Sequence, residues 1–232
     1  METIYGIKEL TRKIHYPVAT IGMFDGVHRG HQKIIECIRH NAIQKKGESV
    51  VITFDRHPKN IIENRPPSFI TSLEHRLKLF EHFGVDHTVV LRFDQKLAQM
   101  TAEDFIREIL VSWLNVKCIV LGFNCHFGKG REGNITLVRK LADKYGFEVY
   151  GCSPVIYRGQ VISSTAIRQA ILEGELEKAE GMLGRPVSIL GTVVKKSGRG
   201  RTLGFPTANL NLHHEVRPPR GVYGTRVRWA GH

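Results

Sequence analysis

Cysteine is scarce in this chain. The four residues that occur, Cys37, Cys118, Cys125 and Cys152, are widely spaced and form no C-x-x-C pair. This spacing argues against a structural zinc site and against a framework of disulfide bonds. Cys118 lies in an apolar run and is expected to be a small core residue. Cys125 lies in a glycine-rich loop, where we expect a more accessible thiol without a chemical role.

Long hydrophobic runs are also absent. The chain has no apolar run near the ~20 residues that a membrane span needs, and its first residues lack the basic and then apolar order of a secretory signal. We therefore expect a cytoplasmic protein that does not interact with a membrane. Its 232 residues allow one large domain, or one domain and part of a second, and 41% hydrophobic residues suffice for a folded core.

Acidic residues are outnumbered by basic ones. The formal net charge of +12 predicts an anionic partner, either nucleic acid or small ligands that carry phosphate. The basic residues recur around glycines, in residues 127–131 and 195–201, rather than in one helix or tail. We therefore favour phosphate-bearing metabolites and regard nucleic acid as the less favoured partner.

The most informative stretch covers residues 19–31. An apolar, β-branched run ends at Asp25 and Gly26, and a helical pattern of apolar residues follows. A junction of strand, glycine turn and helix offers free N–H groups and a partial positive charge to phosphate. His28 and His31 lie at the start of this helix and are expected on the same side of it. The stretch matches neither a Walker A loop nor the G-x-G-x-x-G fingerprint.

The remaining pattern predicts a doubly wound parallel sheet. Apolar runs alternate with amphipathic segments, which is typical of an α/β fold that binds ligands at the carboxyl ends of its strands. His75, His82 and His87 are expected to be solvated rather than to form a metal site. The expected strands are residues 16–24, 50–54, 89–93, 116–121 and 148–152, and the expected helices include residues 32–41, 72–83, 101–114 and 135–145.

Further segments are expected at the same edge of the sheet. His57 follows the second strand, and the loop after the fourth strand contains four glycines and Asn124. Ser163 or Ser164 is a natural N-cap for the helix that carries Arg168. Free N–H groups, hydroxyls and a guanidinium would then face one ligand.

Four motifs stand in order along the chain. Together they resemble the N-terminal module of the bacterial bifunctional riboflavin kinase/FMN adenylyltransferases, the FAD synthetase family, and the H-x-G-H spacing in the first is similar to that of the wider nucleotidyltransferase superfamily. The resemblance implies a Rossmann-like nucleotidyltransferase fold that transfers AMP from Mg-ATP to FMN, giving FAD and pyrophosphate. The motifs are Gly22-x-Phe-Asp-Gly-x-His-x-Gly-His31, Thr53-Phe-x-x-His-Pro58, Gly122-x-Asn-x-x-Phe-Gly128 and Ile162-Ser-Ser-Thr-x-x-Arg168.

The resemblance also implies roles for individual residues. Mg²⁺ would be held through the substrate phosphates, with no metal ligands from this domain. Arg56 stands where the family usually has a proline. The catalytic residues would be His28, His31, Asn124 and Arg168. ATP would be bound by Gly22, Phe24, Asp25, Gly26, Gly30, Ser164 and Thr165, and the flavin would lie near His57, Phe127, Gly128 and Arg131.

Near the C-terminus the pattern changes to short strands with glycine turns, which predict a small β-barrel. We expect an adenylyltransferase domain over residues 1–184 and an incomplete N-terminal portion of a riboflavin kinase-like barrel over residues 185–232. A segment of this portion resembles the riboflavin kinase signature, which implies that Gly204, Thr207 and Asn209 hold Mg-ATP. A portion of this size buries too little surface to fold well alone, so we expect it to be more open to proteolysis.

Two other functions stay open at this point. The chain could transfer an adenylyl group to a different phosphate acceptor, or it could be a non-catalytic regulator that binds flavin or RNA through its basic loops. The presence of both motif histidines and Arg168 argues against a catalytically dead protein. An RNA affinity that falls steeply with salt, without release of pyrophosphate, would argue for a non-catalytic regulator. The small-molecule partners under consideration are ATP, FMN, FAD and riboflavin, and the sequence indicates no oligomeric state.

We predict that the 232-residue polypeptide converts FMN to FAD but does not convert riboflavin to FMN. Phosphorylation of riboflavin needs a base or orienting group within hydrogen-bond reach of the hydroxyl. No Asp or Glu follows Tyr223. Incubation with ATP, Mg²⁺ and either flavin, followed by separation of the products, tests this, and robust formation of FMN from riboflavin would contradict it.

Overall fold

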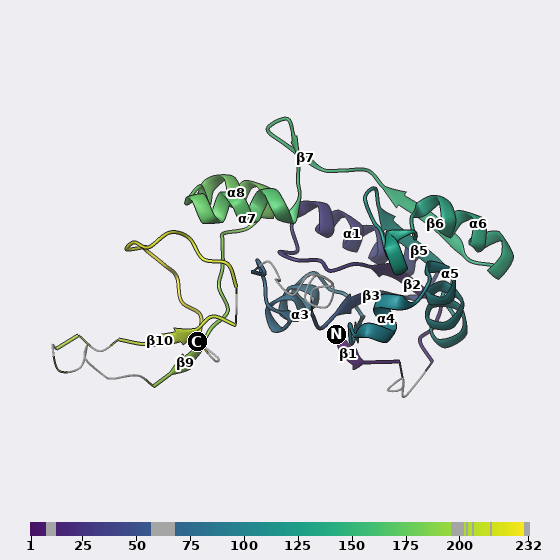
Figure 1. Ribbon diagram of the computed structural model, residues 1–232, viewed down its shortest axis with the longest axis horizontal. Helices are drawn as coiled ribbons and strands as arrows, with labels where there is room; N and C mark the ends of the chain where they lie inside the picture. The colour runs from purple at the N-terminus through teal and green to yellow at the C-terminus, as the bar shows by residue number, and fades with distance from the viewer. Residues whose placement is uncertain are drawn as a thin grey trace.

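A six-stranded parallel sheet is the centre of the fold (Figure 1). The computed structural model describes residues 1–7, 13–56, 68–195, 202, 204, 205, 207–213 and 215–229. The strands pair in the order β1-β4-β3-β2-β5-β6, and each of these pairs is parallel, which confirms the predicted doubly wound sheet. The strands are β1 (Glu2–Tyr5), β2 (Pro17–Ile21), β3 (Glu48–Phe54), β4 (His87–Leu91), β5 (Cys118–Gly122) and β6 (Glu148–Cys152).

The strand order reverses at β2. The chain moves outward from β2 through β3 to β4, and then returns to place β5 on the other side of β2. Loops that leave the carboxyl ends of β2 and β5 therefore run in opposite directions and leave a crevice between them. This reversal fixes where a ligand pocket forms.

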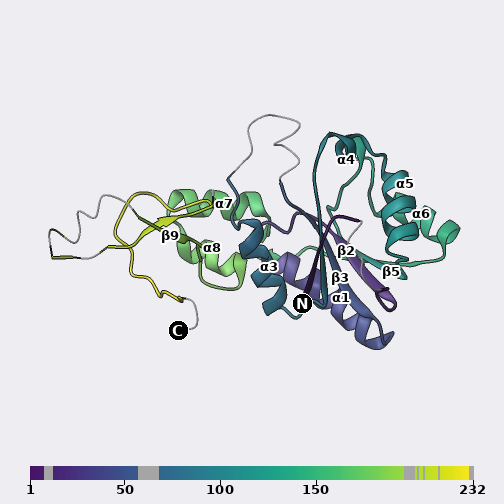
Figure 2. The ribbon, with the colours of Figure 1, turned by 90° about the horizontal axis from the view of Figure 1, so that it is seen from below.

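Helices cover both faces of the sheet (Figure 2). α1 (Arg29–Gln44) and α3 (Leu73–His82) pack on one face, whereas α4 (Gln95–Gln99), α5 (Ala102–Asp104), η1 (Phe105–Trp113) and α6 (Ile135–Tyr145) pack on the other. In β3, Val50 and Ile52 join one hydrophobic cluster and Val51 joins the opposite one. Strands buried on both faces in this way explain the continuous apolar runs in the sequence.

The segment predicted as one helix over 101–114 is wider than an α-helix over most of its length. It begins at Thr101, whose side chain accepts a hydrogen bond from the N–H of Asp104, and continues as the π-helix η1. The helix ends with i to i+5 bonds such as Leu114 N–H to Ile109 O at 3.0 Å. Helical periodicity in the sequence does not distinguish these two forms.

The remaining elements lie outside the six-stranded sheet. α7 (Ser164–Glu173) and α8 (Leu176–Leu183) form a third hydrophobic cluster that includes Ile70 from the segment before α3 and Val216 from the C-terminal part of the chain. β7 (Ile156–Tyr157) pairs with β8 (Gln160–Val161), and β9 (Thr192–Val194) pairs with β10 (Asn209–Asn211), both antiparallel. η2 (Lys129–Arg131) is a short 3₁₀ turn. Among the described residues of the predicted barrel portion, β9 and β10 are the one strand pair.

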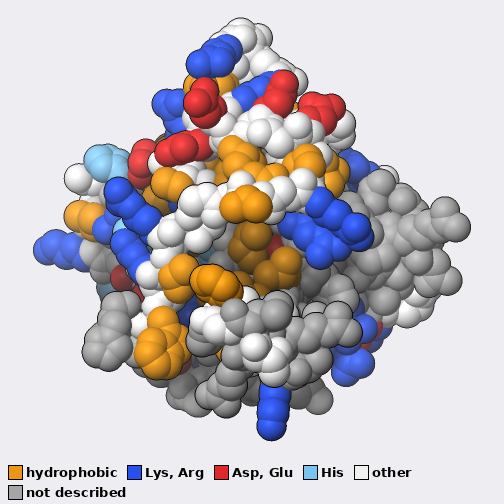
Figure 3. Space-filling view, turned by 90° about the vertical axis from the view of Figure 1, so that its left-hand side faces the viewer, with side chains coloured by type: hydrophobic (Ala, Val, Ile, Leu, Met, Phe, Trp, Pro, Cys, Tyr) orange, Lys and Arg blue, Asp and Glu red, His pale blue; other side chains and the backbone are white. Residues whose placement is uncertain are grey.

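The C-terminal portion presents apolar side chains to solvent. Figure 3, seen from this end of the molecule, shows hydrophobic side chains gathered on the surface with Lys and Arg side chains around them. Exposed hydrophobic residues of this portion include Val193, Leu210, Val222 and Trp229.

No helix in the described ranges is long and apolar enough to cross a membrane.

Two histidines that were expected in solvent are buried. His75 is 8% exposed and His87 is 2% exposed, so the prediction was wrong for both, although His82 is exposed as expected. His87 starts β4 and lies between Glu48, at 3.0 Å from Nε2, and Glu2, at 3.2 Å from Nδ1. Partners from distant strands, which the sequence pattern does not show, make this burial favourable.

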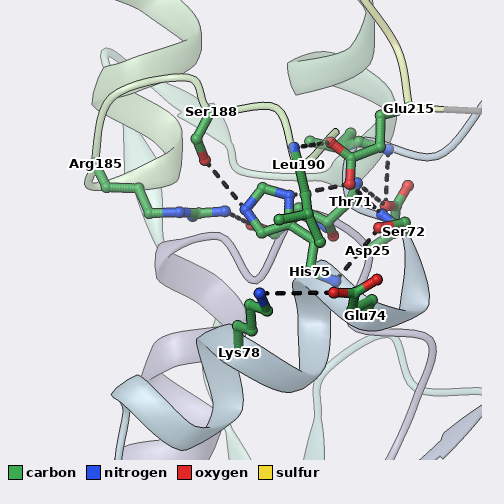
Figure 4. Close-up of polar contacts among 12 residues, drawn as sticks. Asp25, Thr71, Ser72, Glu74, His75, Lys78, Arg185, Ser188, Leu190 and Glu215 are labelled. Atoms are coloured by element: carbon green, nitrogen blue, oxygen red, sulfur yellow. Dashed lines mark hydrogen bonds and ion pairs between the residues drawn. The ribbon is translucent and has the colours of Figure 1, made fainter. Parts of the chain in front are cut away.

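His75 belongs to a polar network that attaches the C-terminal segment to α3 (Figure 4). Glu215 is 5% exposed, and its Oε1 accepts hydrogen bonds from Ser72 N–H at 2.7 Å and from His75 Nδ1 at 3.0 Å. Its Oε2 accepts the N–H of Leu190 at 3.0 Å, and Ser188 Oγ lies 3.2 Å from His75 Nε2. Burial alone would raise the pKa of Glu215, but the hydrogen bonds from His75 and Ser72 outweigh it and leave the pKa lowered.

We predict that Glu215→Ala lowers the free energy of unfolding by about 3 kcal/mol, because it leaves buried donors on Ser72, His75 and Leu190 without their acceptor. Urea denaturation measures this change. The matched control is Glu180→Ala, which removes an exposed carboxylate from α8 and should stay within about 0.5 kcal/mol of the parent protein. Equal stabilities of the two variants would contradict the role of Glu215.

Candidate active site

The turn between β2 and α1 has a strained backbone. Phe24, Gly26 and Val27 have φ angles of +52°, +83° and +38°. Glycine adopts such angles freely, and a Cβ at Gly26 would lie 3.1 Å from Ile70 Cδ1. For Phe and Val, each such angle costs on the order of 1–3 kcal/mol. The surrounding contacts must therefore hold this turn in place.

Asp25 links the turn to two other parts of the chain. Oδ1 of its buried carboxylate accepts the N–H groups of Ile70 at 2.8 Å and Thr71 at 3.1 Å, and Oδ2 lies 2.8 Å from Arg168 Nη2. Burial raises the pKa of Asp25, while the Thr71 N–H and Arg168 act in the opposite direction. Three donors on one carboxylate fix the turn against the start of α3 and against α7.

His28 and His31 form a stacked pair at the start of α1. His28 is the N-cap, and its Nδ1 accepts the N–H of His31 at 3.3 Å. The ring centroids are 3.6 Å apart with an 18° interplanar angle. Burial, together with the positive charge of Arg185, lowers the pKa of His28 to about 4, and burial also lowers that of His31 well below its usual value. Both imidazoles are therefore neutral at pH 7.

A pocket opens at the reversal of the strand order. Its wall comes from the start of α1, the end of β5, the segment that begins at the end of β6, and the start of α7. This is the place at which doubly wound sheets bind ligands. The wall contains five of the residues predicted to be catalytic or to bind ATP, namely His28, Gly30, His31, Asn124 and Ser164.

Other predicted ATP-binding residues lie behind or beside this wall. Phe24 is 3% exposed, and its ring meets that of His31 edge-on at a centroid distance of 5.1 Å. Gly22, Asp25 and Gly26 belong to the same strained turn. Thr165 is exposed on α7 and is not among the residues that form the pocket wall. Their contacts with ATP stay predictions.

The N-cap of α7 is one of the two serines predicted for it, but Arg168 is not among the residues that form the pocket wall. Ser163 is the N-cap and accepts the N–H of Ala166 at 3.2 Å. Ser164 is left to donate its hydroxyl to the carbonyl of Asp25 at 2.9 Å. Arg168 adds a second bond, from Nε to Ser68 O at 2.8 Å, beside its ion pair with Asp25.

The loop after β5 separates its predicted flavin contacts from the pocket. Phe127 is buried against Phe105, with ring centroids 5.5 Å apart. At Gly128, where φ is +73°, a Cβ would lie 2.6 Å from Ala102 N, so the loop packs closely on α5. Arg131 is exposed, and the lining contains none of these three predicted contacts. Their flavin-binding roles stay predictions.

The surroundings of Cys118 and Cys125 do not favour a chemical role for either thiol. Cys118 is buried in the core, as expected. Cys125 is only partly exposed, and burial raises its pKa to about 12. A thiol with such a pKa carries almost no thiolate at neutral pH.

Two predictions concern other parts of the chain. His57 lies outside the described residues. In the C-terminal portion, Asn209 pairs with Val194 in the β9–β10 register and Thr207 is exposed. Gly204 has a φ angle of +79°. The role of Gly204, Thr207 and Asn209 in binding Mg-ATP stays a prediction.

Sequence reasoning missed Arg76, which supports the turn after β2 through hydrogen bonds. Its fully buried guanidinium donates to Met23 O at 2.7 Å, Thr53 Oγ1 at 2.9 Å and Phe54 O at 3.1 Å. Burial lowers its pKa to about 10, so it stays charged at pH 7. The signal was present, because Arg76 lies three residues after Leu73 and four before Phe80, on the apolar face of α3.

Arg185 and Gln32 were also missed. Arg185 donates to Gly26 O at 2.8 Å and Val27 O at 3.2 Å. Gln32 donates to the same Val27 O at 2.8 Å and to Leu183 O at 2.7 Å. No local pattern reveals these contacts, because Arg185 lies more than 150 residues from the turn that it holds.

Sequence models of two families match this chain. The one described as FAD synthetase matches residues 11–166, and the one described as riboflavin kinase matches residues 183–232. The first therefore covers β2 to β6 of the sheet, the turn and the start of α7. The second begins at the end of α8 and includes Arg185 and Glu215.

Curated proteins agree with these matches, and a solved structure is similar to this chain in sequence and fold. The chain is 38% identical over 233 residues to the bifunctional riboflavin kinase/FMN adenylyltransferase of Escherichia coli K12, covering 100% of this chain and 74% of that protein. The protein of the same name from Listeria monocytogenes is 37% identical over 245 residues, covering 100% and 75%. A crystal structure titled as a macrolide-efflux protein from Streptococcus pneumoniae is 32% identical, with a TM-score of 0.78 over 94% of this chain and 72% of that one.

The chain is therefore shorter than these relatives and spans about three quarters of their length. The family matches, the identity along the whole chain and the α/β fold agree with one another. From this agreement we conclude that the chain belongs to the FAD synthetase family, the bifunctional riboflavin kinase/FMN adenylyltransferases.

Proposed function

We propose that adenylyl transfer from ATP to FMN takes place in the pocket between β2 and β5, with the ATP phosphates at the N-terminus of α1. The observation that carries this proposal is the stacked pair His28 and His31, which forms part of the pocket wall at the reversal of the strand order. Membership of the FAD synthetase family identifies the reaction. Adenylyl transfer to a different acceptor and a regulatory role are not favoured.

In the proposed reaction, an oxygen of the FMN phosphate attacks the α-phosphorus of ATP. A new P–O bond forms, the bond to the β-phosphate oxygen breaks, and pyrophosphate leaves with the electron pair. No covalent enzyme intermediate is needed, so the contribution of the protein is positioning and charge stabilisation.

The state of the histidines suits this task. Because His28 Nδ1 accepts the N–H of His31, the ring proton of neutral His28 is on Nε2, which is a donor for a phosphate oxygen. Negative charge that develops on the leaving pyrophosphate raises the pKa of nearby imidazoles. The pair thus binds ATP in neutral form and gains affinity for protons as the charge develops.

Mg²⁺ fits this proposal as an ion carried by the substrate. The described residues contain no group of three His, Cys, Asp or Glu side chains suited to a metal ion, and the buried carboxylate of Asp25 is already bonded to Arg168 and to two N–H groups. Mg²⁺ is commonly bound through substrate phosphates and water. When bound there, it neutralises part of the phosphate charge.

The flavin side of the proposal rests on the loop after β5. Asn124 is exposed in the pocket wall and is proposed to line the site of transfer. Gly128 and Arg131 are proposed to lie near the flavin of FMN, with Phe127 supporting the loop through its packing on Phe105. A cytoplasmic location is part of the same proposal and rests on the composition of the chain.

We predict that His31→Ala lowers the turnover of FMN to FAD by about 100-fold or more, the range for loss of one charge-stabilising donor. FAD formation and pyrophosphate release with ATP, FMN and Mg²⁺ measure it. His82→Ala, at an exposed position on α3, is the matched control and should keep the parent rate. Turnover of His31→Ala at the parent rate would remove the proposed role.

We predict that Arg168→Lys raises the KM for ATP several-fold and that Arg168→Ala raises this KM by about tenfold or more. Lysine keeps the charge but loses the planar fork. The control is Arg139→Lys, which changes an exposed guanidinium on α6.

Asp25→Asn separates two roles of Arg168, because it removes the ion pair and leaves the guanidinium. A rise in KM that is larger in Arg168→Ala than in Asp25→Asn identifies a phosphate contact. Unchanged ATP saturation in both Arg168 variants would overturn the assignment to the triphosphate.

A further inference from the structure

The turn that carries His28 depends on a residue from the far end of the chain. Of its left-handed residues, only Gly26 tolerates the backbone without strain, and Val27 at +38° is an outlier for a β-branched side chain. Such a conformation persists only where its neighbours fix it. His28 follows Val27 directly, so any relaxation of the turn displaces the N-cap of α1 and the imidazole pair.

Arg185 supplies the fixing contacts. Its two terminal nitrogens donate to consecutive carbonyls, Nη2 to Gly26 O at 2.8 Å and Nη1 to Val27 O at 3.2 Å. A planar guanidinium holds two adjacent oxygens in a fixed geometry, whereas an ammonium has three rotatable donors and no rigid fork. Gln32 makes a second bond to Val27 O, and Thr71 Oγ1 accepts the N–H of Gly26, so each polar backbone group of this part of the turn has a partner.

Arg185 is itself held from both sides along the chain, and Figure 4 shows the contacts of the residues that follow it. Before it, α8 ends at Gly184 with a φ angle of +71°, and Leu183 O accepts a hydrogen bond from Gln32. After it, Ser188 Oγ reaches His75 Nε2, and Leu190 N–H reaches the buried carboxylate of Glu215. The guanidinium therefore has little freedom to follow a displaced turn.

We propose that Arg185 is a positioning residue for adenylyl transfer, supplied by the segment that matches the riboflavin kinase model. It holds the carbonyls of Gly26 and Val27 so that His28 and His31 keep their places in the pocket. The inference rests on the proposed roles of these two histidines. It means that a domain ending at residue 184 would lack a part of its own active site.

Charge gives Arg185 a second effect on the pair. Arg185 disfavours protonation of both imidazoles, whereas Arg76 from α3 and His28 disfavour protonation of His31 alone. Removing the charge of Arg185 therefore raises the pKa of both imidazoles. A variant that keeps the charge but loses the fork separates position from charge.

The experiment compares Arg185→Lys and Arg185→Gln in the full chain. We expect both to lower kcat for FAD formation by at least about tenfold, because the imidazoles move from their productive positions. We expect Arg185→Gln alone to move the acid limb of the kcat/KM profile for ATP to higher pH by about half a unit or more. Arg217→Lys and Arg217→Gln change an exposed arginine of the same segment and serve as matched controls.

Thermal unfolding of each variant, with assays well below the transition, separates catalysis from folding. If the Arg185 variants lose stability but keep the parent kcat and acid limb while folded, Arg185 has only a structural role and the proposal is wrong. If Arg185→Gln does not fold, Arg185→Lys decides on kcat alone. The proposed function is tested by parent activity and by His31→Ala, so its failure is distinguishable from failure of this inference.

Discussion

The buried carboxylate of Asp25 is the interaction on which the rest of the site depends. It joins the turn after β2 to the segment before α3 and to Arg168 on α7, which are far apart in sequence. Without three donors, a carboxylate at this depth would be costly to ionise. With them, the carboxylate orients the turn that leads to His28 and His31. The backbone carbonyl of Asp25 also accepts a hydrogen bond from the hydroxyl of Ser164.

Most of the fold could be predicted from the sequence because it follows local rules. Continuous apolar runs such as the one that became β3 identify strands buried on both faces, and the alternation with amphipathic helices identifies a parallel sheet. Strand, glycine turn and helix placed His28 and His31 at the sheet edge, where the pocket lies. The strand order itself is a property of long-range pairing and was only implied by the fold class.

The parts of the site that sequence reasoning missed depend on distant partners. Arg185 and Glu215 are ordinary charged residues by composition, and only their contacts with distant residues show that they support the turn and α3. For Arg76, the sequence signal is its place on the apolar face of α3, and the carbonyls that it supports become visible only in the structure. His75 was placed on a solvated face because its acceptor, Glu215, lies 140 residues away. Phe127, predicted near the flavin from its motif, is packed in the core because α5 lies against its loop, and its role near the flavin stays a prediction.

The spacing of these contacts has a consequence for the order of folding during synthesis. The Asp25–Arg168 and Gly26–Arg185 pairs are separated by 143 and 159 residues, so β2 and its turn leave the ribosome long before their partners exist. Contacts of such separation carry the loop-closure cost of the intervening chain and form late. The sheet can therefore assemble before its ligand site does. A nucleotide that binds only the finished pocket would then act as a ligand of the completely folded chain and draw the equilibrium toward it.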